Sequence, residues 1–193
     1  VQEWGPLVRE SAKLMLSVSK DLKLFAAATS NKNWTLPLLR EAGRHLNYIS
    51  IHGYWDPLFH HNNPAPFIDC MMKTDAPEQD IQRTIGILEE AGFGGGRIKI
   101  AYDEWNLRNW HHPWHGNFRR GFDLEARRKN DIPSQYTMAD ALFSACFLNA
   151  CLRHADIVDI ACFSPIVNTR GAIFVHPEGI LKRTTFHVFD MYV

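Results

Sequence analysis

Apolar residues recur at helical spacing in several separate stretches of this chain. In residues 78–91, Ile81, Ile85 and Leu88 fall at positions i, i+4 and i+7, so they share one face of a helix. Residues 136–153 carry a longer apolar stripe of the same kind. The pattern predicts helices over residues 4–19, 36–46 (with Thr35 as N-cap), 78–91 and 136–153, and a last helix from Thr184 or Thr185.

Short runs of almost only apolar residues lie between these helices. Such runs, when turn residues bound them, are typical of strands that are buried on both faces of a parallel sheet. They predict strands over residues 22–28, 48–52, 98–102 and 157–163. A polar loop over residues 53–75, with room for a turn of helix near residues 68–72, and a second polar loop over residues 106–133 are also expected. A hairpin over residues 170–183, around Pro177-Glu178-Gly179, completes the expected elements.

The alternation of strands and helices indicates the α/β fold class. Strands that are separated by helices form parallel βαβ units. Four such units match half of a (β/α)8 TIM barrel, and they also fit part of an open doubly wound sheet. A dinucleotide-binding fingerprint is absent, because Gly94-Gly95-Gly96 precedes a predicted strand, whereas that motif follows one.

Charge and composition limit the classes of partner. Lys and Arg together number 21, as do Asp and Glu, so the formal net charge is zero. This balance argues against a nucleic acid or an anionic membrane as partner, because both favour basic surfaces. No apolar run reaches the length of a membrane-spanning helix. The six Trp residues suit a carbohydrate-binding platform and an ordinary core equally well.

The four cysteines bear on the compartment. None forms a CxxC pair, and Cys146, Cys151 and Cys162 lie among apolar residues, while Cys70 lies in a predicted loop. We expect the first three to pack as small apolar side chains and not to form a disulfide framework. This pattern favours a reducing compartment and hence the cytoplasm, while secretion of a longer parent protein stays open.

Polar and aromatic side chains follow the predicted strands. In a (β/α)8 barrel the active site gathers at the carboxyl ends of the strands. The third strand leads directly into Glu104, which lies between Tyr102 and Trp105, as a catalytic carboxylate does in many sugar-cleaving barrels. The candidates at the four strand ends are Thr29, Ser30 and Asn31; His52, Tyr54, Trp55 and Asp56; Asp103, Glu104, Trp105 and Asn106; and Ser164, Asn168 and Arg170.

Several longer motifs carry a specific resemblance. They are residues 48–55 (YISIHGYW), 102–106 (YDEWN), 137–142 (TMADAL), 147–156 (FLNACLRHAD), 166–171 (IVNTRG) and 184–192 (TTFHVFDMY). In this order and spacing, over nearly the whole chain, they resemble the α-L-arabinofuranosidases of glycoside hydrolase family 51.

The resemblance implies a domain organisation. The four strands would be strands five to eight of the family's barrel, so residues 1–193 would form the C-terminal half of the catalytic domain. The N-terminal half and the family's C-terminal β-sandwich would then be absent from this chain. The acid/base, a Glu in an Asn-Glu pair of the family, would precede Val1, and we expect the isolated chain to be inactive.

The resemblance also implies a chemistry. Glu104 would be the catalytic nucleophile of a retaining glycosidase, and Tyr54 would hydrogen-bond to it. The substrate would be an arabinose-containing polysaccharide or oligosaccharide, with no cofactor and no metal, and the parent protein could be a homo-oligomer. We expect substrate contacts from Tyr54, His52, Trp55, Asn106, Trp110 and Asn168.

The chain departs from the family at three places. Leu107-Arg108-Asn109 intervene before Trp110, where many members have an aromatic residue sooner, and Gly53 or Pro165 replaces a Gln of many members. These changes leave the sugar contacts near Arg108 and Pro165 open, but they do not affect Glu104.

Other functions fit parts of the sequence. The same barrel could serve another retaining glycosidase, such as a β-xylosidase or an endoglucanase, or a non-catalytic sugar-binding fragment. A metal hydrolase could use His60-His61 and the cluster at residues 111–115 (HHPWH). Neither cluster has the regular helical spacing of zinc hydrolases, so we favour histidines that face solvent or the edge of a substrate site.

Overall fold

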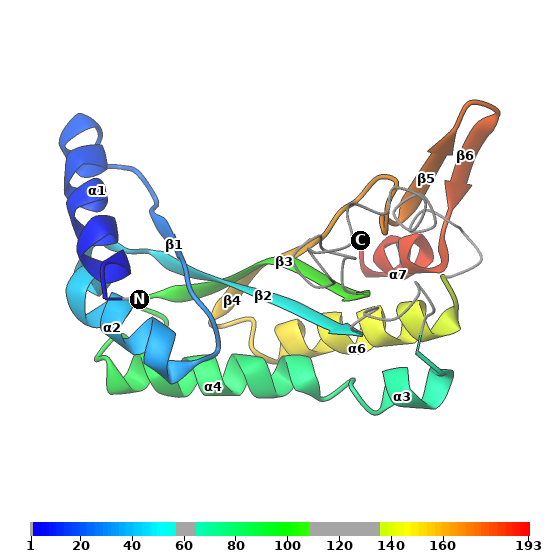
Figure 1. The fold of residues 1–193 in the computed structure, drawn as a ribbon, viewed down its shortest axis with the longest axis horizontal. Helices are drawn as coiled ribbons and strands as arrows, with labels where there is room; N and C mark the ends of the chain where they lie inside the picture. Colours follow the sequence, from blue (N-terminus) through cyan, green and yellow to red (C-terminus); the bar gives the residue numbers. More distant parts are fainter. Residues whose placement is uncertain (1, 57–64, 109–135) are drawn as a thin grey trace, which may run out of the picture. The chain divides into compact units, whose positions relative to one another are not determined.

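The computed structural model describes residues 2–56, 65–108 and 136–193 (Figure 1). The chain forms two compact units. The first comprises Val1–His52, Pro77–Asp103 and Ala150–Cys162, and the second comprises Gly53–Ala76, Glu104–Asn149 and Phe163–Val193.

The described residues include a sheet of four strands, whose spatial order β1-β2-β3-β4 follows the chain. Strand β1 pairs in parallel with β2, with Phe25 opposite Tyr48, and the arrows of β2 and β3 point the same way in Figure 1. This is the order that consecutive βα units produce, so the predicted parallel α/β sheet is confirmed. The strands are β1 (Phe25–Ala27), β2 (Tyr48–Asp56), β3 (Lys99–Arg108) and β4 (Val158–Phe163).

The predicted helices and the hairpin are also present. Helix α1 lies beside α2 (Figure 1), and the hairpin is antiparallel, with His176 opposite Gly179. The helices are α1 (Trp4–Val18), α2 (Lys32–Ala42) with a 3-10 turn at Gly43–His45, α3 (Phe67–Met71), α4 (Ala76–Glu90), α6 (Met138–Arg153) and α7 (Thr184–Tyr192), and the hairpin strands are β5 (Ile173–His176) and β6 (Gly179–Lys182).

The predicted N-cap of α2 was wrong. The side chain of Asn31 accepts a hydrogen bond from the backbone N–H of Asn33, so the helix begins one turn earlier than expected. Thr35, the predicted cap, lies inside the helix and is fully buried. Its hydroxyl donates to the carbonyl of Thr29 at 2.6 Å and accepts from the N–H of Thr29 at 3.0 Å. Thr35 therefore holds the loop after β1 and does not cap the helix.

Strands β2 and β3 extend further than predicted, to Asp56 and Arg108. The predicted strands ended at residues 52 and 102, because polar residues follow both apolar runs. In the structure Asp56, Asn106 and Arg108 are nearly inaccessible to solvent. Their hydrogen bonds and ion pairs compensate for the loss of water, so these polar side chains can remain inside the strands.

Each unit has its own apolar core. In the first, Leu38 and Leu39 of α2 and Ile49 of β2 are buried, and each is at most 1% exposed. In the second, Trp105 stacks on Phe147 with ring centroids 3.7 Å apart. Burial of each such side chain contributes on the order of 1.5–3 kcal/mol to folding.

All four cysteines are free. Cys70 and Cys151 are buried, whereas Cys146 and Cys162 are exposed, so the predicted packing holds for Cys151 and is wrong for the other two. Cys162 lies in β4, the last strand in the order of the described sheet. None of the helices in the described ranges is long and apolar enough to cross a membrane.

Candidate active site

Tyr54 and Glu104 meet in the second unit. The hydroxyl of Tyr54, on β2, donates a hydrogen bond to Oε1 of Glu104, on β3. The same hydroxyl lies 3.3 Å from Oγ of Ser164, which directly follows β4. All three side chains are half-buried. Three neighbouring strands thus bring polar groups around one carboxylate that solvent still reaches.

The residue after Glu104 fixes its direction. Successive side chains of a strand point to opposite faces. Trp105 is fully buried and packs on Phe147 at 3.7 Å and, edge to face, on Phe163 at 5.1 Å. This packing holds one face of β3 against the core, and Glu104 consequently points away from it.

The side-chain amide of Asn106 forms hydrogen bonds with other groups of the protein. Its Nδ2 donates to the carbonyl oxygens of Ser164 at 3.0 Å and Arg170 at 3.1 Å, and its Oδ1 accepts from the N–H of Arg108 at 3.1 Å. The residue is only 2% exposed. Asn106 therefore connects β3 to the segment after β4, and its predicted contact with a sugar stays a prediction.

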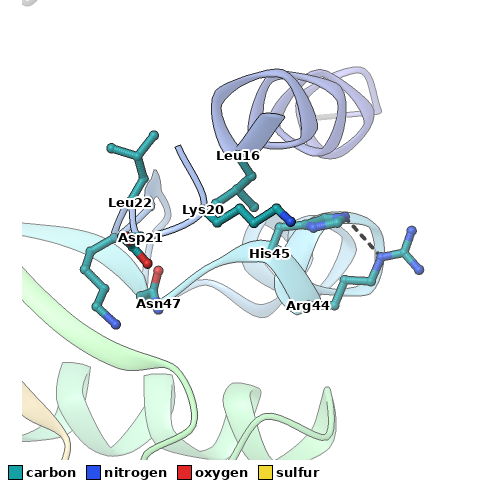
Figure 2. Close-up of a pocket in the computed structure, with 8 residues that line it drawn as sticks. Leu16, Lys20, Asp21, Leu22, Arg44, His45 and Asn47 are labelled. Carbon is teal, nitrogen blue, oxygen red and sulfur yellow. Dashed lines mark hydrogen bonds between the residues drawn. The ribbon is translucent and has the colours of Figure 1, made fainter. Parts of the chain in front are cut away.

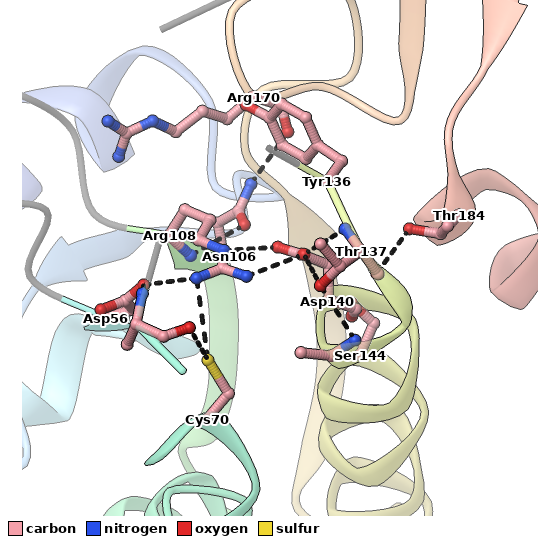
Figure 3. Close-up of polar contacts among 12 residues, drawn as sticks. Asp56, Cys70, Asn106, Arg108, Tyr136, Thr137, Asp140, Ser144, Arg170 and Thr184 are labelled. Atoms are coloured by element: carbon pink, nitrogen blue, oxygen red, sulfur yellow. Dashed lines mark hydrogen bonds and ion pairs between the residues drawn. The ribbon is translucent and has the colours of Figure 1, made fainter. Parts of the chain in front are cut away.

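Arg108 lies at the centre of a buried cluster of charges (Figure 3). Its Nε and Nη2 donate to the two carboxylate oxygens of Asp140 at 2.7 and 2.9 Å, and its Nη1 donates to Asp56 at 2.5 Å. We call Asp56, Arg108 and Asp140 the Arg108 cluster. Its members are 1–3% exposed. Asp56 was expected at a strand end, but the partnership of these three residues was not predicted from the sequence.

The pKa values of the two buried arginines depend on the groups around them. Burial disfavours the charged form of Arg108, but the hydrogen bonds and charges of Asp140 and Asp56 outweigh burial and raise its pKa. For Arg170, also nearly inaccessible, burial dominates and lowers the pKa to about 10. Both guanidiniums remain charged at neutral pH.

The other predicted contact residues lie in different settings. His52 belongs to the first unit, where its Nε2 is 3.4 Å from Asp103 and 3.3 Å from the hydroxyl of Ser50. Trp55 packs on Phe143 and Phe147 at ring-centroid distances of 5.1 and 5.9 Å. The part played by His52 and Trp55 in sugar binding stays a prediction.

Asn168 and Trp110 complete the predicted set. Asn168 has a positive φ of 54°, and its Oδ1 accepts from the N–H of Val175 at 2.8 Å, so it shapes the turn before β5. Trp110 lies outside the described residues. The histidines at 60–61 and 111–115 also lie outside them, and the residues described here contain no group of three or more His, Cys, Asp or Glu that could hold a metal ion.

A separate cavity of about 480 Å³ lies in the first unit, beside the residues that precede β1 and β2 (Figure 2). Arg44 Nε lies 3.1 Å from His45 Nε2 within it. Burial, followed by the charges of Arg44 and Lys13, lowers the pKa of His45. The lining consists of Leu16, Lys20, Asp21, Leu22, Lys23, Arg44, His45 and Asn47, with the lysines and Arg44 exposed to solvent.

Comparison with known proteins connects this geometry to one class of enzyme. Residues 103–193 match the family model of the α-L-arabinofuranosidase C-terminal domain. The chain is 26% identical over 200 residues to an intracellular exo-α-(1→5)-L-arabinofuranosidase of Streptomyces lividans, covering 98% of this chain and 29% of that protein. It is 29% identical over 184 residues to intracellular exo-α-(1→5)-L-arabinofuranosidase 1 of Bacillus subtilis, covering 92% and 35%.

Solved structures show the same fold. The α-L-arabinofuranosidase of Thermotoga maritima, in an arabinose complex, superposes with a TM-score of 0.78 at 22% identity, covering 98% of this chain and 35% of that one. A family 51 α-L-arabinofuranosidase from Bifidobacterium longum gives a TM-score of 0.78 at 23% identity, covering 98% and 39%. The chain thus resembles α-L-arabinofuranosidases in sequence and fold.

The particular resemblance read from the motifs, to the α-L-arabinofuranosidases of glycoside hydrolase family 51, is confirmed. The chain spans about a third of the length of the curated relatives that it matches. The matched segment 103–193 consists, in its described part, of the end of β3, α6, β4, the β5–β6 hairpin and α7.

Proposed function

We propose that this chain is part of a retaining α-L-arabinofuranosidase of family 51 and carries its nucleophile, Glu104. Residues 1–193 would form the C-terminal half of the (β/α)8 catalytic domain, strands five to eight with their helices. Two findings support this placement. The strands follow the order β1-β2-β3-β4, and the chain superposes on somewhat more than a third of the length of each of two solved enzymes.

The hydrogen bond from Tyr54 to Glu104 is the observation that carries the proposal. A nucleophilic carboxylate must stay ionised and hold a fixed direction while it attacks. A phenol that donates to the carboxylate restricts the rotation of the side chain and so fixes the direction of its oxygens. Glu104 is half-buried, so a sugar could still approach it.

The proposed reaction has two steps. In the first, a carboxylate oxygen of Glu104 bonds to the anomeric carbon while the bond to the leaving oxygen breaks, and a second carboxylic acid gives that oxygen a proton. In the second step, the second carboxyl group, ionised by the loss of its proton in the first step, removes a proton from water. The oxygen of that water displaces Glu104 from the anomeric carbon. The configuration is retained because each step inverts it. By resemblance the second carboxyl would precede Val1.

The substrate class follows from the relatives. Two are named for exo action on α-(1→5)-linked L-arabinofuranose, so we propose removal of terminal α-L-arabinofuranosyl units from arabinan, arabinoxylan or their oligosaccharides, with the α-(1→5) linkage to be tested first. Rates on furanoside and pyranoside substrates distinguish this activity from that of a β-xylosidase or an endoglucanase.

Covalent trapping tests the role of Glu104. The intact parent enzyme would be treated with a 2-fluorinated arabinofuranosyl reagent, digested and mapped by mass spectrometry, and we expect the sugar on Glu104. Glu104→Gln should reduce turnover at least about 1,000-fold, because a neutral amide is a poor nucleophile. Glu178→Gln, at the exposed hairpin turn, is the matched control and should keep full activity. A label on any other side chain would refute the assignment.

The isolated chain gives a second test. If residues 1–193 lack the acid/base, they should not hydrolyse a nitrophenyl α-L-arabinofuranoside, even when correctly folded by circular dichroism. Turnover by the purified chain would contradict the half-barrel proposal while leaving the role of Glu104 to the trapping experiment.

A further inference from the structure

We propose that Arg108 is a positioning residue that binds two buried carboxylates, Asp56 and Asp140, at once and thereby holds Tyr54 against Glu104. The part of this inference that concerns catalysis rests on the proposed function. The part that concerns the two carboxylates rests on the geometry of the second unit alone.

Asp56 connects the end of β2 to the segment before α3. The N–H of Ala65 donates to Oδ2 of Asp56 at 3.1 Å, and Nη1 of Arg108 donates to the same oxygen at 2.5 Å. One carboxylate oxygen therefore joins Ala65 to Arg108.

Asp140 connects the end of β3 to the start of α6. In the first turn of α6, Asp140 accepts hydrogen bonds from Nε and Nη2 of Arg108 and from the N–H of Thr137, the last at 2.8 Å. The guanidinium of Arg108 thus binds Asp56 and Asp140 with different nitrogen atoms (Figure 3).

The Arg108 cluster lies further along β2 and β3 than the pair Tyr54–Glu104. Tyr54 precedes Asp56 by two residues on β2, and Glu104 precedes Arg108 by four on β3. Residues separated by two or four positions in a strand share a face. The pair Asp56–Arg108 therefore fixes the two strands against each other just past the pair Tyr54–Glu104.

Charge makes this arrangement dependent on Arg108. Both aspartates are almost completely buried, and Arg108 supplies them with three charge-assisted hydrogen bonds. Lys73 also pairs with Asp56, but its Nζ lies 3.9 Å from Oδ1, further than the 2.5 Å contact of Arg108. Removing a partner from a buried ion pair destabilises the local structure, because it leaves a buried charge with less compensation. Without Arg108, we expect both carboxylates to move or to take up water.

Amide hydrogen exchange on the 193-residue chain tests the contacts of Ala65 and Thr137 without a substrate. Arg108→Met keeps most of the side-chain length and removes the charge. We expect the amides of Ala65 and Thr137 both to exchange at least about tenfold faster, equivalent to about 1.4 kcal/mol of local opening free energy. Arg153→Met is the matched control, because Arg153 also binds a carboxylate through two nitrogens, at 3.0 and 2.5 Å from Glu78, in the other unit.

Two further measurements separate positioning from general loosening. The ring carbon resonance of Tyr54, assigned by its loss in Tyr54→Phe, should shift in Arg108→Met and not in Arg153→Met. Arg108→Lys, a milder change that still folds if Arg108→Met does not, keeps the charge but loses the two-nitrogen contact. It should therefore release Thr137 more than Ala65.

The outcomes decide the proposal. Faster exchange at both amides with a shifted Tyr54 signal supports it. Faster exchange at only one amide, at neither, or equally in Arg153→Met overturns it, and an unchanged Tyr54 signal overturns the link to Glu104. None of these readouts needs arabinofuranosidase activity. In the intact enzyme, Arg108→Met should lower kcat more than it raises KM, and that result is interpreted only if the trapping of Glu104 succeeds.

Discussion

Tyr54 donates its phenolic hydrogen bond to the carboxylate of Glu104, which follows it by 50 residues in the chain and lies on the neighbouring strand. Replacing Tyr54 by Phe keeps the ring and removes only this donor. Hydrogen bonds to charged groups contribute about 1.5–3 kcal/mol, so kcat/KM of the parent enzyme should fall about 10- to 100-fold. Steady-state kinetics on an aryl arabinofuranoside checks this.

A second tyrosine supplies the control for that experiment. The hydroxyl of Tyr48 also bonds to a carboxylate, Asp159, at 3.0 Å, but in the first unit. Tyr48→Phe should leave kcat/KM within about twofold of the parent value, as expected for a surface change outside the site. Equal losses in both variants would show that the Tyr54 effect is structural.

The pH dependence of stability should depend in part on Glu78. Burial opposes its charge, but hydrogen bonds from His154 and Arg153 outweigh burial and lower its pKa. A carboxyl whose pKa is lower in the folded state stabilises the fold at pH values above its unfolded pKa, about 4.3, and loses this contribution as the pH falls through the folded value. Because this cluster is only partly buried, we expect at most about 1 kcal/mol.

Denaturant unfolding at pH 7, 5, 4 and 3 measures this contribution. Glu78→Gln should be less stable than the parent chain at pH 7, and the difference should shrink as the pH falls below about 5. Glu90→Gln removes a more exposed carboxylate that pairs with Lys32 at 2.7 Å, so it should change stability little at any of these pH values. A Glu78→Gln difference that grows toward acid pH would contradict the assigned sign.

Thiol reactivity should divide the cysteines into two classes. Burial raises the pKa of Cys151 to about 12 and also raises that of Cys70, whereas Cys146 and Cys162 are exposed. Only a thiolate reacts with iodoacetamide, so at pH 8 the folded chain should be labelled at Cys146 and Cys162 at least about 100 times faster than at the buried pair. Peptide mass mapping over time, with a urea-unfolded sample as reference, provides the measurement. Rapid labelling of Cys151 in the folded chain would contradict its burial.

Much of the fold follows from apolar periodicity. Ile81 and Leu88, two residues of the stripe that predicted α4, are fully buried in the structure. The errors arose where polar residues take structural roles. The ends of β2 and β3 have the hydropathy of loops, because they contain polar residues such as Asp56 and Arg108. These two charges compensate each other only after the strands are aligned. A sequence profile shows each charge but not its partner.

The site was predictable to a similar extent. Glu104 and Tyr54 could be found because a strand leads into each of them, and the structure brings them together. The Arg108 cluster was missed, although one signal was available. Asp56 continues the alternation from Tyr54, and Arg108 continues it from Glu104, so strand periodicity would have placed both on the face of the site. Asp140, on α6, could not be connected to them without the tertiary structure.

The amide of Asn106 carries a consequence for how this chain can vary. It gives both of its hydrogens to carbonyl oxygens and receives one from a backbone N–H. Spontaneous deamidation to Asp would replace the donor Nδ2 with a carboxylate oxygen that repels those two carbonyl oxygens. Deamidation of Asn106 should therefore destabilise the fold as an Asn106→Asp mutation would. Its neighbour Leu107 is apolar and only 1% exposed, so we expect this position to tolerate other apolar residues of similar volume.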